Sequence, residues 1–113
     1  MTSATPQDHQ RARVLLAQIN QLGFCLPGTL TERHTRCSSP GCRCRADPPA
    51  LHGPYYSWTR KINGKTVTRT ITPEQARRYQ PWFDDARQLR VLAAELEALS
   101  LGLAKAAERW GEI

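Results

Sequence analysis

Two β-rich runs and the turn between them decide the fold of this chain: YYSWTRKINGKTVTRTI, residues 55–71. The turn is Asn63-Gly64, a dipeptide that accepts the positive φ required at both central positions of a type I′ turn. Such a turn joins the two strands of a hairpin through two residues, so Ile62 is predicted to pair with Lys65. The rest of the register follows from that pair: Arg60 opposite Val67, Trp58 opposite Arg69, and Tyr56 opposite Ile71.

This register gives the hairpin two different faces, because alternate side chains of a strand point to opposite sides of the sheet. One face is largely apolar and is predicted to be core: Tyr56, Trp58, Ile62, Val67 and Ile71. The other face is rich in hydroxyls and basic at its tip: Ser57, Thr59, Lys61, Thr66, Thr68 and Thr70. Arg60 and Arg69 fall on the apolar face, where Arg69 can stack on the ring of Trp58.

The segments before the hairpin predict an α+β fold. Apolar residues at helical spacing predict an N-terminal helix from about Gln7 to Leu22, which Gly23 ends. Leu26-Pro27-Gly28 predicts a turn, and a Thr-rich run predicts a short strand over residues 29–36. The expected architecture is an N-terminal helix, a small antiparallel β-sheet whose loop holds Cys37, Cys42 and Cys44 and is a predicted zinc loop, and a long, coiled-coil-like C-terminal helix.

The segment after the hairpin predicts two helices. Thr72 is the predicted N-cap, with Pro73 at the first helical position and Gln75 at the third. Pro81 lacks an amide donor and disfavours a helical residue before it, so a break is predicted near Gln80. The prediction is a short helix over residues 73–79, followed by a long one over 81–110.

The long helix carries a seam of apolar residues spaced alternately by three and four. Its members are Leu89, Leu92, Leu96, Leu99, Leu103, Ala106 and Trp110, of which the five leucines are the predicted oligomerisation residues. Two interpretations stay open: the seam joins two copies in a homodimer, or it packs within the chain against the N-terminal helix. The expected organisation is a flexible N-terminus over 1–6, a zinc-hairpin domain over 7–80, and a helical arm over 81–113 for oligomerisation or partner binding.

Three cysteines lie within eight residues, at Cys37, Cys42 and Cys44, and Pro40-Gly41 supplies a turn between the first two. Thiolates brought together by a turn are typical ligands of zinc, which takes four sulfur or nitrogen ligands in a structural site. The three thiols therefore predict a zinc site that needs one more ligand.

The fourth ligand has three candidates: His52, His34 and Cys25. His52 is preferred, because its binding would tie the loop to the start of the hairpin. Four protein ligands leave no position for a reactive water, so the predicted metal is structural. Iron could replace zinc on the same thiolates.

Positive charge is concentrated in the middle of the chain. The 113 residues have a net charge of +6, whereas residues 31–80 alone hold ten Lys or Arg against three acids, a net +7. Phosphate neutralisation is the commonest use of such a block. The predicted nucleic-acid-binding residues are its ten cations: Arg33, Arg36, Arg43, Arg45, Arg60, Lys61, Lys65, Arg69, Arg77 and Arg78.

Three motifs stand together in this part of the chain: Leu26-Pro27-Gly28-Thr29-Leu30, Cys37-x4-Cys42-x-Cys44 and His52-Gly53-Pro54-Tyr55-Tyr56. In combination they resemble a small prokaryotic domain family of unknown function, whose members are often associated with transposases or integrases of mobile elements. The resemblance implies that the three cysteines and His52 are hallmark positions of the family. It implies no biochemical activity.

The sequence favours a binding protein over an enzyme, since it holds no Gly-rich phosphate loop, no nucleophile elbow and no plausible carboxylate pair. The expected function is zinc-stabilised binding of nucleic acid, with duplex DNA preferred, by an accessory or regulatory factor of a mobile element. One alternative is an adaptor that docks a recombinase or transposase through the helical arm. Another is a binder of single-stranded nucleic acid or RNA that stacks bases on Tyr55, Tyr56 and Trp58.

The sequence shows no segment with the character of a targeting signal or a membrane-spanning helix. The first apolar stretch, Val14–Leu22, is interrupted by polar residues and lacks the character of a signal peptide. No run approaches the ~20 apolar residues of a membrane-spanning helix. The expected location is the cytoplasm, where four cysteines are thiols or metal ligands more often than disulfides.

Overall fold

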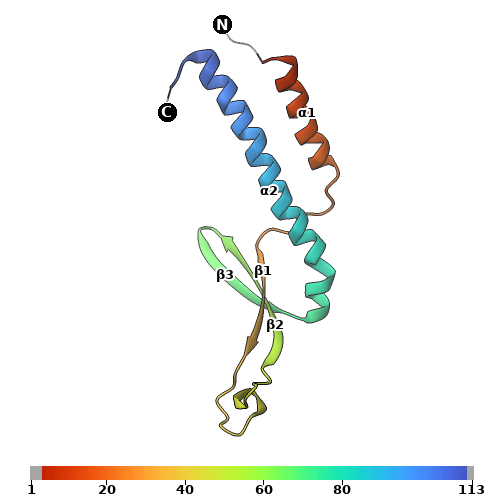
Figure 1. Ribbon diagram of the computed structural model, residues 1–113, viewed down its shortest axis with the longest axis vertical. Coiled ribbons are helices and arrows are strands. Elements are labelled where there is room, and N and C mark those ends of the chain that lie inside the picture. The colour runs from red at the N-terminus through yellow and green to blue at the C-terminus, as the bar shows by residue number, and fades with distance from the viewer. Residues whose placement is uncertain (1–3, 112–113) are drawn as a thin grey trace. The chain divides into compact units, whose positions relative to one another are not determined.

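The computed structural model describes residues 4–111 (Figure 1). In chain order the elements are helix α1 (Pro6–Asn20), strand β1 (Thr29–Thr35), a 3-10 turn (Arg43–Arg45), strands β2 (His52–Ile62) and β3 (Lys65–Ile71), and helix α2 (Pro73–Glu108). The predicted α+β arrangement of a helix, an antiparallel sheet and a long C-terminal helix is confirmed. None of the helices in the described residues combines the length and apolar character needed to cross a membrane.

The hairpin of β2 and β3 has the predicted register. Ile62 pairs with Lys65 and Trp58 with Arg69, and the pairing continues to Tyr56 and Ile71. The turn residues Asn63 and Gly64 have φ values of 51° and 80°, as a type I′ turn requires. The predicted core on this face is only partly confirmed: Tyr56, Trp58 and Ile71 are half-buried, whereas Ile62 and Val67, near the tip, are 38% and 40% exposed.

Strand β1 completes a three-stranded sheet in the order β1-β2-β3, with β1 antiparallel to β2. The pairing shifts between Arg33 and Thr35, which places a bulge at the end of β1. Gly53 on β2 lies against this bulge with a φ of 119°, and a Cβ there would lie 2.8 Å from the Arg33 carbonyl oxygen. A side chain at position 53 is therefore excluded both by backbone conformation and by space.

The predicted turn before β1, Leu26-Pro27-Gly28, is hydrogen-bonded to the middle of β2. The indole Nε1 of Trp58 donates a hydrogen bond of 2.9 Å to the carbonyl oxygen of Pro27. Gly28 has a φ of 111°, and a Cβ on it would come within 2.6 Å of the Thr59 carbonyl oxygen. The turn thus needs glycine, since it combines positive φ with a close approach of two backbones.

Both helices begin with a capping box. At α2 the Thr72 amide donates to Gln75 Oε1 (2.9 Å) and the Gln75 amide donates to Thr72 Oγ1 (3.1 Å), as predicted. At α1, Thr5 and Asp8 exchange equivalent bonds, with the Thr5 amide 2.8 Å from Asp8 Oδ2. The predicted flexible segment 1–6 is therefore wrong at residues 5 and 6, which form the cap and first turn of α1; residues 1–3 lie outside the described part of the chain.

The predicted break near Gln80 is wrong, because α2 is continuous from Pro73 to Glu108 with Pro81 inside it. An interior proline costs a helix roughly 3 kcal/mol through its missing amide and its ring. Packing on both sides of Pro81 offsets this cost, since Ala76 and Phe83 are 3% and 2% exposed. The helix also ends before the predicted residue 110: Arg109 has a left-handed φ of 56°, and Trp110 lies beyond the helix.

The chain divides into two compact units. The sheet unit, residues 26–83, contains the three strands and the first part of α2. The helical unit, residues 1–25 with 84–113, contains α1 and the rest of α2. The predicted zinc-hairpin domain over 7–80 had placed α1 with the sheet, whereas the compact units place it with the C-terminal part of α2.

Within the helical unit, α1 runs beside α2 (Figure 1). Leu15 of α1 and Leu92 of the predicted seam are 0% and 3% exposed. Arg11 bridges to Glu95 at 3.0 Å, and the Gly23 amide donates to Asp85 Oδ2 at 2.8 Å. These contacts support the interpretation of the leucine seam as an intrachain contact.

Candidate metal centre

Strand pairing brings together two of the predicted metal ligands. The last pair of β1 with β2 is Thr35 opposite His52, so His52 lies at the end of the sheet where β1 finishes. Cys37 follows two residues after Thr35, which is close enough to turn toward the imidazole. The ligands at 37 and 52 are thus positioned by the backbone hydrogen bonds of the sheet.

The loop between β1 and β2 supplies the other two ligands. A turn closes through the Cys42 amide, which donates to the Ser39 carbonyl oxygen at 3.2 Å. The 3-10 turn Arg43–Arg45 follows at once and holds Cys44, whose side chain is fully buried. The guanidinium of Arg45 donates hydrogen bonds from Nε (3.1 Å) and Nη2 to the carbonyl oxygen of Cys37, and so links the 3-10 turn to the start of the loop.

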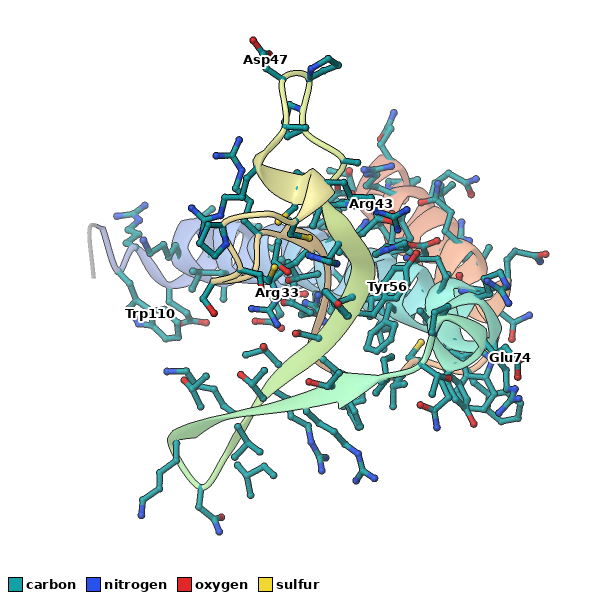
Figure 2. All side chains as sticks on the ribbon, turned by 90° about the horizontal axis from the view of Figure 1, so that it is seen from below. Arg33, Arg43, Asp47, Tyr56, Glu74 and Trp110 are labelled. Carbon is teal, nitrogen blue, oxygen red and sulfur yellow. The ribbon has the colours of Figure 1, made fainter. Side chains whose placement is uncertain are left out.

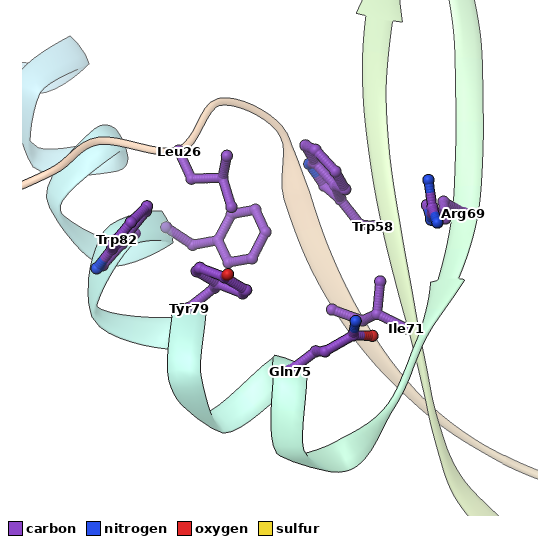
Figure 3. Close-up of a pocket in the computed structure, with 8 residues that line it drawn as sticks. Leu26, Trp58, Arg69, Ile71, Gln75, Tyr79 and Trp82 are labelled. Atoms are coloured by element: carbon purple, nitrogen blue, oxygen red, sulfur yellow. The ribbon is translucent and has the colours of Figure 1, made fainter.

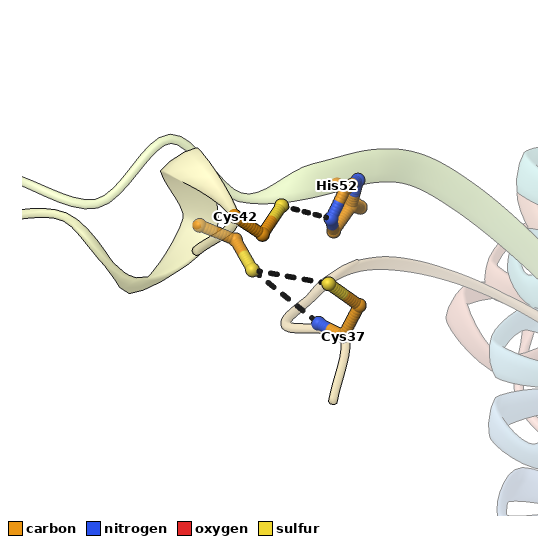
Figure 4. Close-up of side chains that lie close together, drawn as sticks. Cys37, Cys42 and His52 are labelled. Carbon is orange, nitrogen blue, oxygen red and sulfur yellow. Dashed lines mark hydrogen bonds between the residues drawn. The ribbon is translucent and has the colours of Figure 1, made fainter. Parts of the chain in front are cut away.

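The four side chains converge on one point (Figure 4). The Sγ atoms of Cys37, Cys42 and Cys44 and a ring nitrogen of His52 all lie within 4.8 Å of one another. Cys37 Sγ is 3.7 Å from Cys44 Sγ, and Cys42 Sγ is 3.2 Å from His52 Nε2. Two thiolates on a tetrahedral zinc lie about 3.8 Å apart, given a Zn–S bond of about 2.3 Å. The spacing of the donors therefore suits one metal ion.

The electrostatics of the cluster favour the thiolate form of Cys37, which is the form that binds a metal ion. The pKa of Cys37 is lowered to about 6, first by a hydrogen bond from the Ser39 backbone and then by His52, Cys42 and Cys44. The pKa of Cys42 is raised overall. A hydrogen bond from the Cys44 backbone lowers this pKa, but hydrogen bonds with the thiols of Cys44 and Cys37 raise it by more. A metal ion would therefore meet Cys37 largely as a thiolate, and its binding would displace the proton of Cys42.

The predicted set of three cysteines and His52 is thus brought together, and these residues could hold a metal ion. Neither alternative fourth ligand belongs to the cluster among the described residues. His34 lies at the bulge of β1, and the Cys25 thiol lies in the helical unit, 3.6 Å from the Gly23 carbonyl oxygen.

The ten predicted nucleic-acid-binding cations are all exposed, and all belong to the sheet unit. Figure 2 shows Arg33 and Arg43 near the strands, while Asp47 lies at the tip of the loop that projects from them. The predicted stacking partner of Trp58 was wrong: the guanidinium over its ring, 4.6 Å from the centroid, belongs to Arg60, and Arg69 lies beside the ring as its cross-strand partner.

The hydroxyl-rich face of the hairpin extends onto β1, which the sequence-based prediction missed. Thr29 pairs with Thr59, and Thr31 pairs with Ser57, so these four side chains share one face. We call this surface the hydroxyl face; it consists of Thr29, Thr31, Ser57, Thr59, Thr66, Thr68 and Thr70. The alternation of Thr residues in 29–31 could have revealed the extension had the register of β1 been known.

Residues 6–80 match the model of a family described as a domain of unknown function, DUF6788, and the chain belongs to that family. The match includes all four residues of the metal cluster and the whole sheet, and it ends within α2. The searches of curated proteins and of solved structures gave no match.

Proposed function

We propose that this member of the DUF6788 family is a zinc-stabilised protein that binds nucleic acid, with duplex DNA as its preferred ligand, and that the sheet unit makes the contacts. Zinc is proposed because Cys3His is a common structural zinc set. In this role the metal fixes the loop between β1 and β2 and takes no part in chemistry.

The separation of charge between the two units carries the proposal. The sheet unit holds ten Lys or Arg against three acids, a net +7, whereas the helical unit holds six against seven, a net −1. In the described part of the chain, no ion pair joins the ten cations to the acids of their unit. Uncompensated cations gathered on one unit attract a polyanion, because each phosphate they neutralise releases counterions.

The hydroxyl face gives the proposed interface its second component. Hydroxyl groups donate to phosphate oxygens and to base edges, and strands of a small sheet can enter the major groove. Arg33 and Lys61 lie on the same face as the hydroxyls by the strand register, at opposite ends of it. Such a face would combine positioning contacts from the cations with short-range contacts from its threonines, whereas Ser57 is only 6% exposed.

The metal loop adds a third component. Arg36, Arg43 and Arg45 are exposed on the segment that the cluster organises. A metal ion would hold these arginines in a fixed arrangement, whereas the free loop would lose conformational entropy on binding. Nucleic-acid affinity is therefore expected to depend on the metal.

The biological setting proposed is that of an accessory or regulatory factor of a mobile element. It rests on the resemblance of the Leu-Pro-Gly, cysteine and His-Gly-Pro-Tyr motifs to proteins found near transposases and integrases.

The proposal is tested by fluorescence anisotropy of the zinc-loaded full chain with duplex DNA, single-stranded DNA and RNA of one sequence. If half of the ten cations contact phosphates, duplex affinity should fall by roughly 500-fold between about 50 and 200 mM salt. If RNA or single-stranded DNA binds more tightly than duplex DNA, that nucleic acid is the preferred ligand and duplex DNA is not. Failure to bind any of the three at low salt would refute the proposed function.

An adaptor function is the second candidate, and exposed apolar residues favour it. In the helical unit Val91, Leu101 and Trp110 are 47%, 52% and 51% exposed. Such residues could contact a recombinase or transposase. Binding of this kind would change little with salt, which distinguishes it from phosphate binding.

A further inference from the structure

A cavity of the sheet unit lies between β2, β3 and the first part of α2 (Figure 3). It has a volume of about 330 Å³ and opens to solvent. Aromatic rings form much of its wall: Trp58 from the sheet, and Tyr79, Trp82 and Phe83 from the helix. Known ligand pockets span about 300–1,000 Å³, so this one suits a single small ring system.

The floor of the pocket is apolar and its rim is polar. Phe83 is almost fully buried and meets the Trp58 ring edge-on, with ring centroids 6.2 Å apart. Arg69 and Gln75 are exposed lining residues. Gln75 Oε1 is already used in the cap of α2, so the amino group of this side chain is left as a donor.

Arg69 lines the pocket, and two further arginines lie over rings of its wall. Arg60 lies over Trp58 at 4.6 Å, and Arg78 lies over Tyr79 at 5.8 Å. Arg69, beside Trp58, makes no ion pair among the described residues. A ligand that suits this site therefore joins a flat ring to an anionic group.

We propose that this pocket binds one unpaired base of a nucleic acid, with the phosphate of that nucleotide held by Arg69. The inference rests on the proposed nucleic-acid binding and adds a site on the sheet face opposite the hydroxyl face. Proteins that take up unstacked bases combine aromatic surfaces with arginine and a few polar groups, as this pocket does.

The test compares three labelled duplexes of one sequence: fully paired, with one bulged adenosine, and with an abasic site in place of that adenosine. The zinc-loaded full chain should bind the bulged duplex roughly tenfold tighter, within about 5- to 150-fold, than the paired one. The abasic duplex should lose this preference, since only the ring is missing.

Variants assign the preference to the pocket. Tyr79→Leu keeps an apolar side chain but removes a ring, and Arg69→Gln removes the charge; both should bring the ratio of bulged to paired affinity close to one. Arg33→Gln removes a charge from the opposite face of the same sheet and should leave that ratio unchanged while weakening both affinities. Circular dichroism and metal content establish that each variant is folded.

The outcomes separate the two proposals. Binding of the paired duplex without preference for the bulge, or a preference that survives Tyr79→Leu and Arg69→Gln, would overturn the base pocket and leave the proposed function standing. Absence of binding to all three duplexes would overturn both. Displacement of the bulged duplex by adenosine monophosphate supports the pocket, whereas displacement only by N-acetylphenylalanine would assign it to a protein side chain and overturn the inference.

Discussion

The Nε2 atom of His52 lies 3.2 Å from the Sγ atom of Cys42, ten residues earlier in the chain. His52 is placed by its pairing with Thr35 across the sheet, and Cys42 by the turn that its own amide closes with Ser39. The cluster therefore links the irregular loop to the regular sheet. A metal ion bound there would stabilise both, because the binding free energy of a structural metal contributes to folding.

Removal of a ligand should abolish metal binding. Cys37→Ser and His52→Ala are expected to lose the bound zinc and to lower the midpoint of thermal unfolding, since three donors bind zinc much more weakly than four. Metal content of the purified proteins measures the first effect. Cys25→Ser and His34→Ala are matched controls that should retain one zinc per chain; a loss in either would reassign the fourth ligand.

Arg45 should support the metal centre more than its neighbour Arg43 does. Its guanidinium bonds to the Cys37 carbonyl oxygen and so helps to orient a ligand. Loss of such a supporting contact typically weakens metal affinity by about 10- to 100-fold. Competition with a chromophoric chelator should show this loss for Arg45→Ala and little change for Arg43→Ala; equal losses would show that only local charge matters.

The hairpin tip should contribute separable phosphate contacts. Lys61→Gln and Lys65→Gln, both exposed, are each expected to reduce the slope of log affinity against log salt by about one for duplex DNA. Arg13→Gln, an equal change of charge in the helical unit, should leave the slope unaltered. An effect of Arg13→Gln as large as that of the lysine variants would remove the basis for assigning the interface to the sheet unit.

Gly28→Ala should destabilise the protein by about 1–3 kcal/mol. The new Cβ would face the Thr59 carbonyl oxygen at 2.6 Å, on a backbone with positive φ. Chemical denaturation with zinc present measures the change. Gly41→Ala is the control, because a Cβ there meets nothing within 4 Å; comparable losses in both variants would mean that the close approach at Gly28 is relieved elsewhere.

Acid should weaken the start of α1 through Asp8. Hydrogen bonds from the backbone and then the side chain of Thr5 lower the pKa of Asp8 below its ordinary value of 3.8. A carboxyl whose pKa is lower in the folded chain stabilises it above the ordinary pKa, and this contribution disappears as pH falls through the lowered value. The difference in unfolding midpoint between the natural chain and Asp8→Asn should shrink as the pH falls through the ordinary pKa of 3.8 and below it; a constant difference would contradict the role of the carboxylate.

Local chemistry made the hairpin and the helix starts predictable. The Asn63-Gly64 dipeptide fixed the β2–β3 register, and Thr72 with Gln75 marked the start of α2, because each signal acts within a few residues. The cysteine spacing likewise pointed to a cluster. Selection of His52 over His34 was harder, since it depends on the bulge between Arg33 and Thr35, a consequence of pairing between distant strands.

The wrong and the incomplete predictions also depend on contacts between residues that are distant in sequence. Pro81 indicated a break that the burial of Phe83 and Ala76 overrides, and packing of this kind is invisible in a local pattern. The leucine seam was identified, but its partner could not be, because a heptad looks alike whether it faces its own chain or another. The burial of Leu15 and the Arg11–Glu95 ion pair favour a contact within the chain, which spacing alone could not indicate.

The central claim is that a metal-organised, cationic sheet unit binds nucleic acid, and one measurement tests it most directly. The full chain is titrated into a labelled DNA duplex at several salt concentrations, once zinc-loaded and once after removal of zinc by a chelator. The account predicts saturable binding that falls steeply with salt and is lost or strongly weakened without zinc. Absence of binding at low salt, or binding indifferent to both salt and zinc, would contradict it.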